Sequence, residues 1–349
     1  MRATRQPRWK DVALRLAEGI PVERLHPAVR AWVAGRTRSA RGAWAVACSG
    51  GADSVALLLL MWAHWPERRK KLLVVHFDHR VRGVASARDE RFCRSLAGEL
   101  GCRYRAGRWK GARKEAGEAE LRTVRHAFFK TELERAGGLA LWLGHQADDV
   151  AETMFMRMAR GSGAGGLAVP RPVQRLEGGW VRVRPLLGIG KAELRERLEE
   201  AGGLWREDES NLEGRYFRNR IRTEVVPAWR RATSDRNALA GACLSRELLQ
   251  EDDEALEAWL DELRPLGRGA RLDLGVLGGR PRALWRRAIH RWLKASGYRG
   301  DLSKRGFEHL LDAAVLGKPT RQSMGSEGFA VIDGRLLRYS KNLGRRTQK

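Results

Sequence analysis

The sequence has few cysteines, and their positions argue against two kinds of site. Only four occur among its 349 residues: Cys48, Cys93, Cys102 and Cys243. None belongs to a C-x-x-C pair, and none lies near a histidine pair with the spacing of zinc ligands. We therefore expect reduced packing residues in a cytoplasmic protein, and neither a disulfide framework nor a zinc site.

Long hydrophobic runs are also missing. The longest uninterrupted run covers residues 55–63, well short of the roughly 20 residues that a membrane-spanning helix needs. The charged stretch at residues 1–10 has no apolar segment after it, so it does not resemble a secretion signal. These absences argue against membrane insertion and against secretion.

Acidic residues are scarce relative to basic ones. The chain has 42 Asp and Glu against 67 Lys and Arg, which gives a formal net charge of +25. A polyanionic partner such as nucleic acid accounts for this excess, because phosphates attract clustered cations. A general bias of the source proteome towards arginine on solvated surfaces is the alternative explanation.

Between about residues 43 and 190 the sequence alternates short apolar runs with helical patterns. The runs at 43–48, 72–77, 103–108 and 139–144 predict strands. Residues 54–65, 86–100 and 118–136 carry apolar side chains at spacings of three and four, which predicts helices. Repeated βαβ units build a doubly wound parallel sheet, so the predicted fold class is α/β.

The pattern changes after Pro170. A strand-like stretch at 180–184 precedes a helix at 191–201, and a helix over 217–226 is expected to stop before Pro227. Beyond residue 233 the sequence predicts helices, most clearly at 238–260 and 282–295. We therefore predict an N-terminal extension (1–40), an α/β catalytic domain with its linker helix (41–230) and a smaller, mainly helical C-terminal domain (231–349).

One loop has the features of a phosphate site. A strand, a Gly-Gly turn and a helix start follow one another there, and the turn is formed by Ser49, Gly50, Gly51, Ala52, Asp53 and Ser54. Adjacent glycines let backbone amides approach an anion, and the helix directs its positive end to the same point. Asp53 stands where a kinase-type loop has lysine. A carboxylate beside phosphates requires a cation between them, so Asp53 predicts Mg²⁺. The alternative is a plain turn in which Asp53 caps the helix.

The segment from Ser49 to Ser54 resembles the PP-loop of the ATP pyrophosphatase superfamily. Members of that superfamily have an adenine nucleotide alpha hydrolase-like fold, adenylate a carbonyl oxygen and release pyrophosphate. Further segments are similar to tRNA(Ile)-lysidine synthetases, at 76–82, 118–126, 144–153, 160–163, 205–211 and 218–225. Weaker similarity at 284–295 and 302–312 extends this resemblance over nearly the whole chain.

The resemblance implies a two-step reaction. ATP adenylates the C2 oxygen of cytidine 34 in the CAU anticodon of tRNA(Ile), and the ε-amino group of L-lysine then displaces AMP. The implied protein is a cytoplasmic ligase that uses ATP, Mg²⁺, L-lysine and tRNA, with tRNA also bound by residues 231–349. The sequence leaves open whether the chain forms a homodimer.

The resemblance also implies roles for individual residues. Asp53 and Asp149 are expected to hold Mg²⁺ and to form the catalytic group with Arg222, and Asp149 is either a metal ligand or the base for the incoming amine. His145 is expected to contact ATP, with an ordinary loop histidine as the alternative. Phosphate or tRNA contacts are expected from Arg122, Arg125, Arg218 and Arg220. The alternatives are that Asp148 and Asp149 only cap a helix and that the arginines form a solvated basic face.

Some residues depart from the family pattern. Gln146 stands where a second histidine is common, Leu121 and His126 replace a small residue and a tyrosine, and Gly165 replaces an aspartate. Two alternatives therefore stay open: another PP-loop enzyme such as a tRNA thiolase, and a basic RNA-binding protein that no longer turns over ATP. The string at 161–166 fits G-x-G-x-x-G but follows a predicted helix instead of a strand, so NAD is not predicted.

Overall fold

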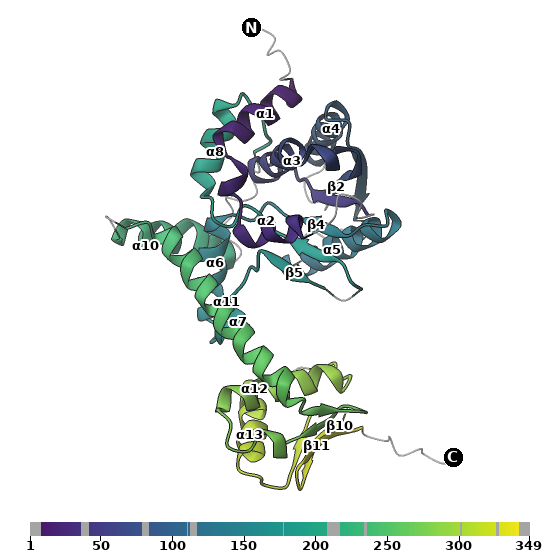
Figure 1. Ribbon diagram of the computed structural model, residues 1–349, viewed down its shortest axis with the longest axis vertical. Helices are drawn as coiled ribbons and strands as arrows, with labels where there is room; N and C mark the ends of the chain where they lie inside the picture. The colour runs from purple at the N-terminus through teal and green to yellow at the C-terminus, as the bar shows by residue number, and fades with distance from the viewer. Residues whose placement is uncertain are drawn as a thin grey trace. The chain divides into compact units, whose positions relative to one another are not determined.

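The computed structural model describes most of the chain. The described residues are 8–35, 42–78, 84–109, 111, 117–176, 178–207, 217–233, 236–300, 302–325 and 328–341. Residues 79–82 and 208–211, which belong to two of the segments singled out above, lie outside them. The chain divides into two compact units, Met1–Leu249 and Gln250–Lys349, and each is described by itself (Figure 1).

The first unit is built on a six-stranded sheet in the order β3-β2-β1-β4-β6-β5. Its strands are β1 (Trp44–Ala47), β2 (Leu72–Asp78), β3 (Arg103–Arg108), β4 (Ala140–Trp142), β5 (Val173–Arg175) and β6 (Val181–Val183). All neighbours pair in parallel except β5, which runs antiparallel to β6 at one edge. The chain leaves β1 towards β2 and β3 and later returns to the other side of β1 with β4. The predicted doubly wound parallel sheet is thus confirmed.

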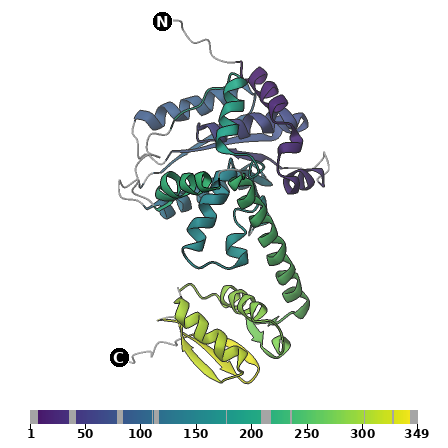
Figure 2. The same ribbon diagram turned by 90° about the vertical axis from the view of Figure 1, so that its left-hand side faces the viewer.

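Helices cover both faces of this sheet, because successive strand residues point to opposite sides. Trp44 and Val46 of β1 face a core shared with α1 (Trp9–Gly19), α3 (Ala52–His64), α4 (Val84–Glu99) and α8 (Lys191–Glu200). Ala45 faces the opposite core, which is covered by α5 (Glu118–Arg135). The two layers of helices can be followed in Figures 1 and 2.

The N-terminal segment belongs to this packing. Val12 and Leu16 of α1 are fully buried in the first core, and Val29 of α2 (Pro27–Ala34) joins them. The predicted N-terminal extension therefore contributes core residues to the α/β unit.

A smaller core brings α6 (Ala147–Met158) against a segment about 70 residues later. It contains Ala147 and Ala151 of α6 together with Ile221, Val226 and Leu239. The later segment consists of α9 (Phe217–Arg220), one π-helical turn (Ile221–Val225) and α10 (Val226–Ala232). This packing places the basic residues of 217–232 beside α6.

The expectation that the helix stops before Pro227 was wrong. After the π-helical turn, Pro227 lies at the start of α10, where the N–H that proline lacks is not needed for an intrahelical bond. The string at 161–166 follows α6 and overlaps the short α7 (Ala164–Leu167), so it does not connect a strand to a helix. That geometry agrees with the interpretation that it is not a dinucleotide fingerprint.

The second unit contains helices, as predicted, and a sheet that the sequence did not predict. Its core is formed by residues of the last turns of α11 (Ala238–Leu263), of α12 (Arg282–Ala295) and of α13 (Lys304–Val315), packed against an antiparallel sheet. The order is β7-β8-β11-β10-β9. The strands are β7 (Leu266–Gly267), β8 (Arg271–Asp273), β9 (Thr320–Ser323), β10 (Gly328–Asp333) and β11 (Leu336–Lys341). The predicted domain boundary after residue 230 precedes α11, whereas the division between the compact units falls within it.

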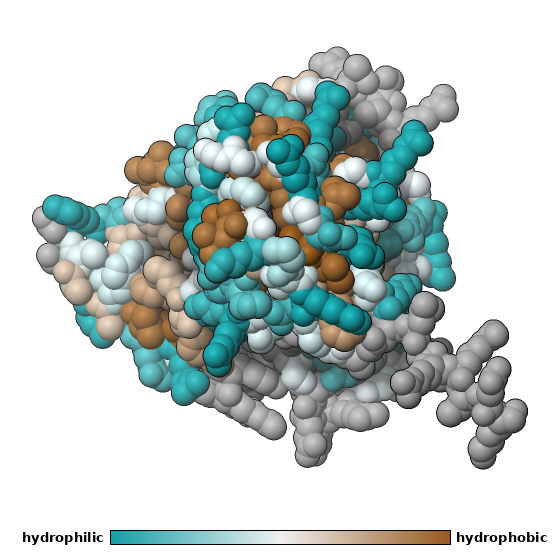
Figure 3. All heavy atoms as spheres, turned by 90° about the horizontal axis from the view of Figure 1, so that it is seen from below, coloured by the Kyte–Doolittle hydropathy of each residue, from teal (hydrophilic) through white to brown (hydrophobic). Residues whose placement is uncertain are grey.

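The surface carries isolated hydrophobic side chains. In the second unit Val315, Leu316 and Leu336 are exposed. On the face seen in Figure 3, hydrophobic areas are separated by hydrophilic side chains. None of the described helices is long and apolar enough to cross a membrane. All four cysteines are free thiols, as expected.

Candidate active site

The loop after β1 has the geometry of an anion site. Its backbone turns at Gly50, whose φ of +94° is a conformation that L side chains rarely adopt. Ser54 braces the turn, because its Oγ accepts a hydrogen bond from the Ser49 amide (3.1 Å) and donates one to the Gly51 carbonyl (2.9 Å). The Ser54 hydroxyl is thus used within the loop, whereas Ser49 is exposed.

Helix α3 begins at Ala52, directly after this turn. Its first amides, including those of Ala52 and Asp53, have no intrahelical partner, and the positive end of the helix dipole lies at the same place. The geometry therefore suits a phosphate group, as the sequence predicts.

The segment after β4 packs tightly against this helix start. A Cβ placed on Gly144 would lie 2.8 Å from the backbone oxygen of Asp53 and 3.0 Å from its carbonyl carbon. The absence of a side chain at Gly144 thus lets the β4 and β1 loops touch, and this contact brings Asp53 close to residues 145–149.

Replacing this glycine is expected to disturb the nucleotide site. In Gly144→Ala the new methyl group must displace the first turn of α3, because the atom it meets belongs to the backbone. We expect the affinity for a non-hydrolysable ATP analogue to fall at least about tenfold, which corresponds to roughly 1.4 kcal/mol. Isothermal titration calorimetry measures the change. Gly188→Ala is the matched control, because its Cβ would meet nothing within 4 Å. Equal affinities of the two variants would contradict the idea that this contact shapes the site.

Two carboxylates come together at this edge of the sheet. Burial and the nearby negative charge of Asp149 raise the pKa of Asp53 to about 6. The Oδ1 atom of Asp53 is buried without a hydrogen-bond partner. A pair of carboxylates with an unsatisfied buried oxygen suits a divalent cation. Among the described residues no group of three or more His, Cys, Asp or Glu could hold a metal ion. Mg²⁺ commonly needs only one or two carboxylates when substrate phosphates complete its shell, so Asp53 and Asp149 fit the predicted ion.

Asp149 has a structural role in addition. Its Oδ2 accepts a hydrogen bond from the Gln146 amide (3.0 Å), while the Gln146 side chain accepts one from the Asp148 amide (2.9 Å). Together these bonds form a capping box at the start of α6. Asp149 therefore does cap helix α6, as the alternative interpretation predicts. Capping uses its Oδ2 atom, so Oδ1 is available to the arginines of the 217–225 segment.

An ion-pair network connects α6 with that segment. Arg222 binds Glu152 through two bonds, from Nε to Oε1 (2.6 Å) and from Nη2 to Oε2 (3.0 Å). Arg218 donates to Glu152 Oε2 (2.9 Å) and to Asp149 Oδ1 (2.7 Å). Burial opposes the charge of each arginine, but Asp149 and Glu152 outweigh it and raise the pKa of both. The charge of Asp53 contributes to the raised pKa of Arg222, so the three predicted catalytic residues are electrostatic neighbours.

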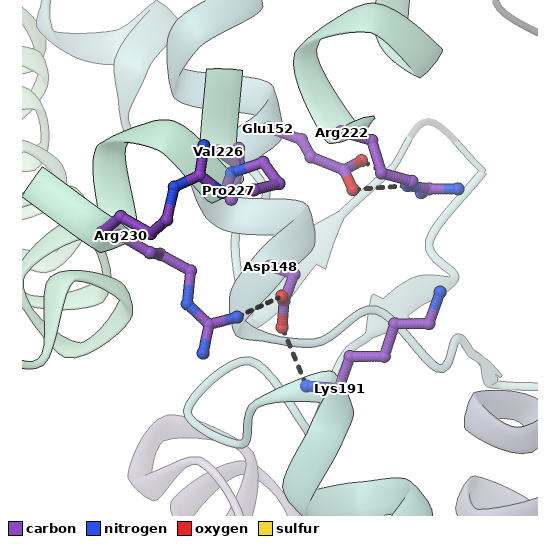
Figure 4. A pocket seen from close by; sticks show the side chains of 8 residues that line it. Asp148, Glu152, Lys191, Arg222, Val226, Pro227 and Arg230 are labelled. Carbon is purple, nitrogen blue, oxygen red and sulfur yellow. Dashed lines mark hydrogen bonds and ion pairs between the residues drawn. The ribbon is translucent and has the colours of Figure 1, made fainter. Parts of the chain in front are cut away.

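A cavity of about 450 Å³ opens beside this network (Figure 4). It is lined by Asp148, Glu152, Lys191, Arg222, Val226, Pro227, Arg230 and Arg231. Asp148 accepts a hydrogen bond from the Lys191 backbone amide (2.8 Å) and lies 3.7 Å from Arg230 Nη1. The cavity thus offers carboxylates and cations to one small ligand.

The remaining predicted residues lie at different distances from this centre. The charges of Arg122 and Arg125 on α5 contribute to a lowered pKa at His145, so these arginines are neighbours of the histidine. Arg218 is engaged by carboxylates, whereas Arg220 is exposed and lies over the ring of Phe217.

Sequence reasoning missed several residues of this region. Lys191, Arg230 and Glu152 of the cavity were not among the predicted site residues. Arg184 was also missed, because it follows β6 (Val-Arg-Val) in a stretch with two arginines, and only the structure shows that it is buried and therefore needs an explanation.

Comparisons with known proteins agree with this architecture. Residues 27–229 match the family model of the PP-loop domain. The chain is 36% identical over 288 residues to the tRNA(Ile)-lysidine synthase of Geobacter sulfurreducens, an alignment that covers 78% of this chain and 59% of that protein. It is 38% identical to the protein of the same name from Gloeobacter violaceus, covering 78% and 81%. With that of Bradyrhizobium diazoefficiens it shares 33% identity, covering 83% and 82%. The chain thus spans less than two thirds of the Geobacter relative and most of the other two.

Proposed function

The chain belongs to the tRNA(Ile)-lysidine synthase family of PP-loop proteins, and we propose on that basis that it is a cytoplasmic ligase that joins L-lysine to cytidine 34 of tRNA(Ile). The observation that carries the proposal is the meeting of Asp53, Asp149 and Arg222 beside the Ser49–Ser54 loop. This arrangement places an anion site, two carboxylates and a paired arginine together at the carboxyl ends of parallel strands, where ligands bind in such sheets.

In the first step, the C2 oxygen of cytidine 34 attacks the α-phosphorus of ATP, and the bond between the α- and β-phosphates breaks. The amides at the start of α3 hold the phosphates, and Arg222 stabilises negative charge that develops on them. Arg222 is oriented for this by its two bonds to Glu152. Asp53 and Asp149 are the residues that would hold Mg²⁺, which would neutralise phosphate charge when bound.

In the second step, the ε-nitrogen of lysine bonds to C2, the bond from C2 to the adenylate oxygen breaks, and AMP leaves. The amine loses a proton, and in the alternative to its role as a metal ligand Asp149 is the proposed acceptor. The cavity beside Asp148 and Arg230 is of a size for an amino acid and carries charges of both signs, which supports lysine as the co-substrate. The basic excess of the chain supports a tRNA substrate, with the predicted C-terminal domain contributing to its binding.

The test is a lysine-transfer assay with purified protein, ATP, Mg²⁺ and labelled L-lysine. Two tRNAs with a CAU anticodon, tRNA(Ile) and tRNA(Met), are compared in parallel. We expect lysine-dependent AMP release and label on tRNA(Ile) only. Sulfur incorporation instead would establish a tRNA thiolase, and tRNA binding without pyrophosphate release would establish an RNA-binding protein that does not turn over ATP.

The arginines of the 217–225 segment supply an internal control for this assay. Arg222→Ala is expected to lower the rate about a hundredfold or more, because it removes the cation proposed to stabilise charge that develops on the phosphates. Arg220→Ala changes an exposed side chain two residues away and is expected to retain the rate at saturating tRNA. Equal losses of rate in both variants would contradict the proposed role of Arg222 in the reaction.

A further inference from the structure

Arg184 is a buried cation whose bonds do not form an ion pair. It directly follows β6 and is only 2% exposed. Its Nη1 donates to the Arg171 carbonyl (2.6 Å), its Nη2 to Gln174 Oε1 (3.4 Å) and its Nε to His145 Nδ1 (2.9 Å). Among the described residues, none of these acceptors is a carboxylate. A buried guanidinium without a carboxylate partner lowers the stability of the folded protein. The bond from Arg184 to His145 is therefore better explained by a role in function.

The bond between Arg184 and His145 fixes the protonation of the histidine. A guanidinium has five N–H donors and no acceptor, so His145 Nδ1 must offer its lone pair. The imidazole is therefore neutral, and its single proton lies on Nε2. Burial lowers the pKa of Arg184 to about 9, which still leaves it charged at neutral pH.

The surroundings of His145 also favour its neutral form. Burial, followed by the charges of Arg184, Arg218, Arg122 and Arg125, holds the pKa of His145 well below its usual value. His145 lies three residues beyond the end of β4, next to Gly144, which contacts the start of α3. It remains partly exposed, so Nε2 can reach a ligand.

We infer that Arg184 is a positioning residue that holds His145 as a neutral imidazole whose Nε2–H donates a hydrogen bond to a phosphate oxygen of the bound nucleotide. The inference rests on the proposed function for the identity of the ligand. Four arginines around a neutral donor make an anionic oxygen the chemically matched partner. The same argument excludes His145 as the base for the lysine amine, because Nδ1 is occupied and Nε2 already carries the proton.

The protonation state can be observed without any substrate. In the full-length protein with ¹⁵N-labelled histidine, two-bond ¹⁵N–¹H correlation spectra distinguish protonated from unprotonated ring nitrogens, and His145→Gln assigns the signal. We expect unprotonated Nδ1 and protonated Nε2, unchanged from about pH 6 to about pH 8, where an ordinary histidine titrates. In Arg184→Met we expect this fixed state to be lost, and in Arg184→Lys, which keeps a donor, to be retained. A proton on Nδ1 in the wild-type protein would overturn the inference.

The kinetics of pyrophosphate release then test whether the Nε2–H group donates a hydrogen bond to the nucleotide. His145→Gln places an amide N–H near the Nε2 position and is expected to stay within about tenfold of the wild-type kcat. His145→Leu, which has no donor, is expected to lose about a hundredfold or more, the size of effect seen when one donor to a developing charge is removed. Equal kcat values for the Gln and Leu variants would contradict the role as donor.

The outcomes separate this inference from the proposed function. If wild-type protein transfers no lysine to tRNA, the proposed function fails, while the spectrum still decides the protonation of His145. If Arg184→Met does not fold, Arg184→Lys carries the test: retained Nε2–H with retained kcat supports the positioning role, and a titrating His145 with unchanged kcat overturns it.

Discussion

Asp53→Asn is expected to lower pyrophosphate release by about a thousandfold or more and at the same time to stabilise the apoprotein at neutral pH. The loss of activity follows because the amide cannot neutralise a cation beside the phosphates, and charge stabilisation at such a centre is commonly worth several kcal/mol. The gain in stability follows because burial and the charge of Asp149 disfavour the ionised carboxylate in the folded protein.

The sign of the pH dependence is fixed by the direction of this pKa change. Folding raises the pKa of Asp53 from 3.8 to about 6, so the charged form destabilises the folded state above pH 6 and the effect disappears as pH falls below 4. Partial exposure of the side chain reduces the size of this effect. We expect Asp53→Asn to raise the free energy of unfolding by about 1–2 kcal/mol at about pH 8 and by almost nothing at about pH 4.

Hydrogen exchange of the α3 amides measures this difference in solutions free of divalent ions, because it reports the opening of this unit alone. Asp11→Asn, which changes an exposed carboxylate on α1, is the control and should change neither activity nor the pH dependence. Added Mg²⁺ should stabilise the wild-type protein and not Asp53→Asn. An Asp53→Asn protein less stable than wild type at pH 8 would contradict the proposed carboxylate pair.

The α/β unit could be predicted from the sequence because its central strands β1, β2 and β4 are buried on both faces. Residues 44–47 of β1 and 72–75 of β2 form continuous apolar runs between helices with clear periodicity. The sheet of the second unit gave no such signal. Strand β9 is Thr-Arg-Gln-Ser, and β8 has only three residues and pairs with β11, more than 60 positions later in the chain. Strands this short or this polar lack the alternation of apolar residues that marks a strand in a single sequence, although β9 pairs with the nearby β10 and β8 with the nearby β7.

In the candidate site, too, contiguous residues could be predicted from the sequence, whereas contacts between distant segments could not. The loop from Ser49 to Ser54 is contiguous, so its residue order alone predicts a phosphate site and an associated cation. The partners of Arg218 and Arg222 lie 66 to 70 residues earlier in the chain, at Asp149 and Glu152. An ion pair over that separation depends on how α6 packs against the 217–225 segment, and a single sequence does not contain that information.

The second large effect is expected at Glu152, which connects the two arginines. Its side chain is 3% exposed, whereas those of Arg218 and Arg222 are 19% and 29% exposed. Glu152→Gln leaves two partly buried guanidinium groups whose remaining ion-pair partner in this network is Asp149, with Asp53 as a further nearby negative charge for Arg222. Breaking a buried pair costs about 3–5 kcal/mol, and partial solvation of the arginines reduces this to roughly 2–3 kcal/mol. Arg222 also loses its orientation, so the rate of AMP release should fall at least about tenfold.

The matched control for Glu152→Gln is Glu193→Gln, which breaks the exposed pair between Glu193 and Arg24 in the same unit. That variant should lose less than about 1 kcal/mol and retain its activity. Hydrogen exchange of the α6 amides gives the free energies. In the double variant Glu152→Gln/Arg222→Gln the loss of stability should be smaller than the sum of the single losses, because removing the second charge relieves the imbalance left by the first. Strictly additive losses would mean that the two side chains do not stabilise the packing of α6 through each other, and that Asp149 orients Arg222 instead.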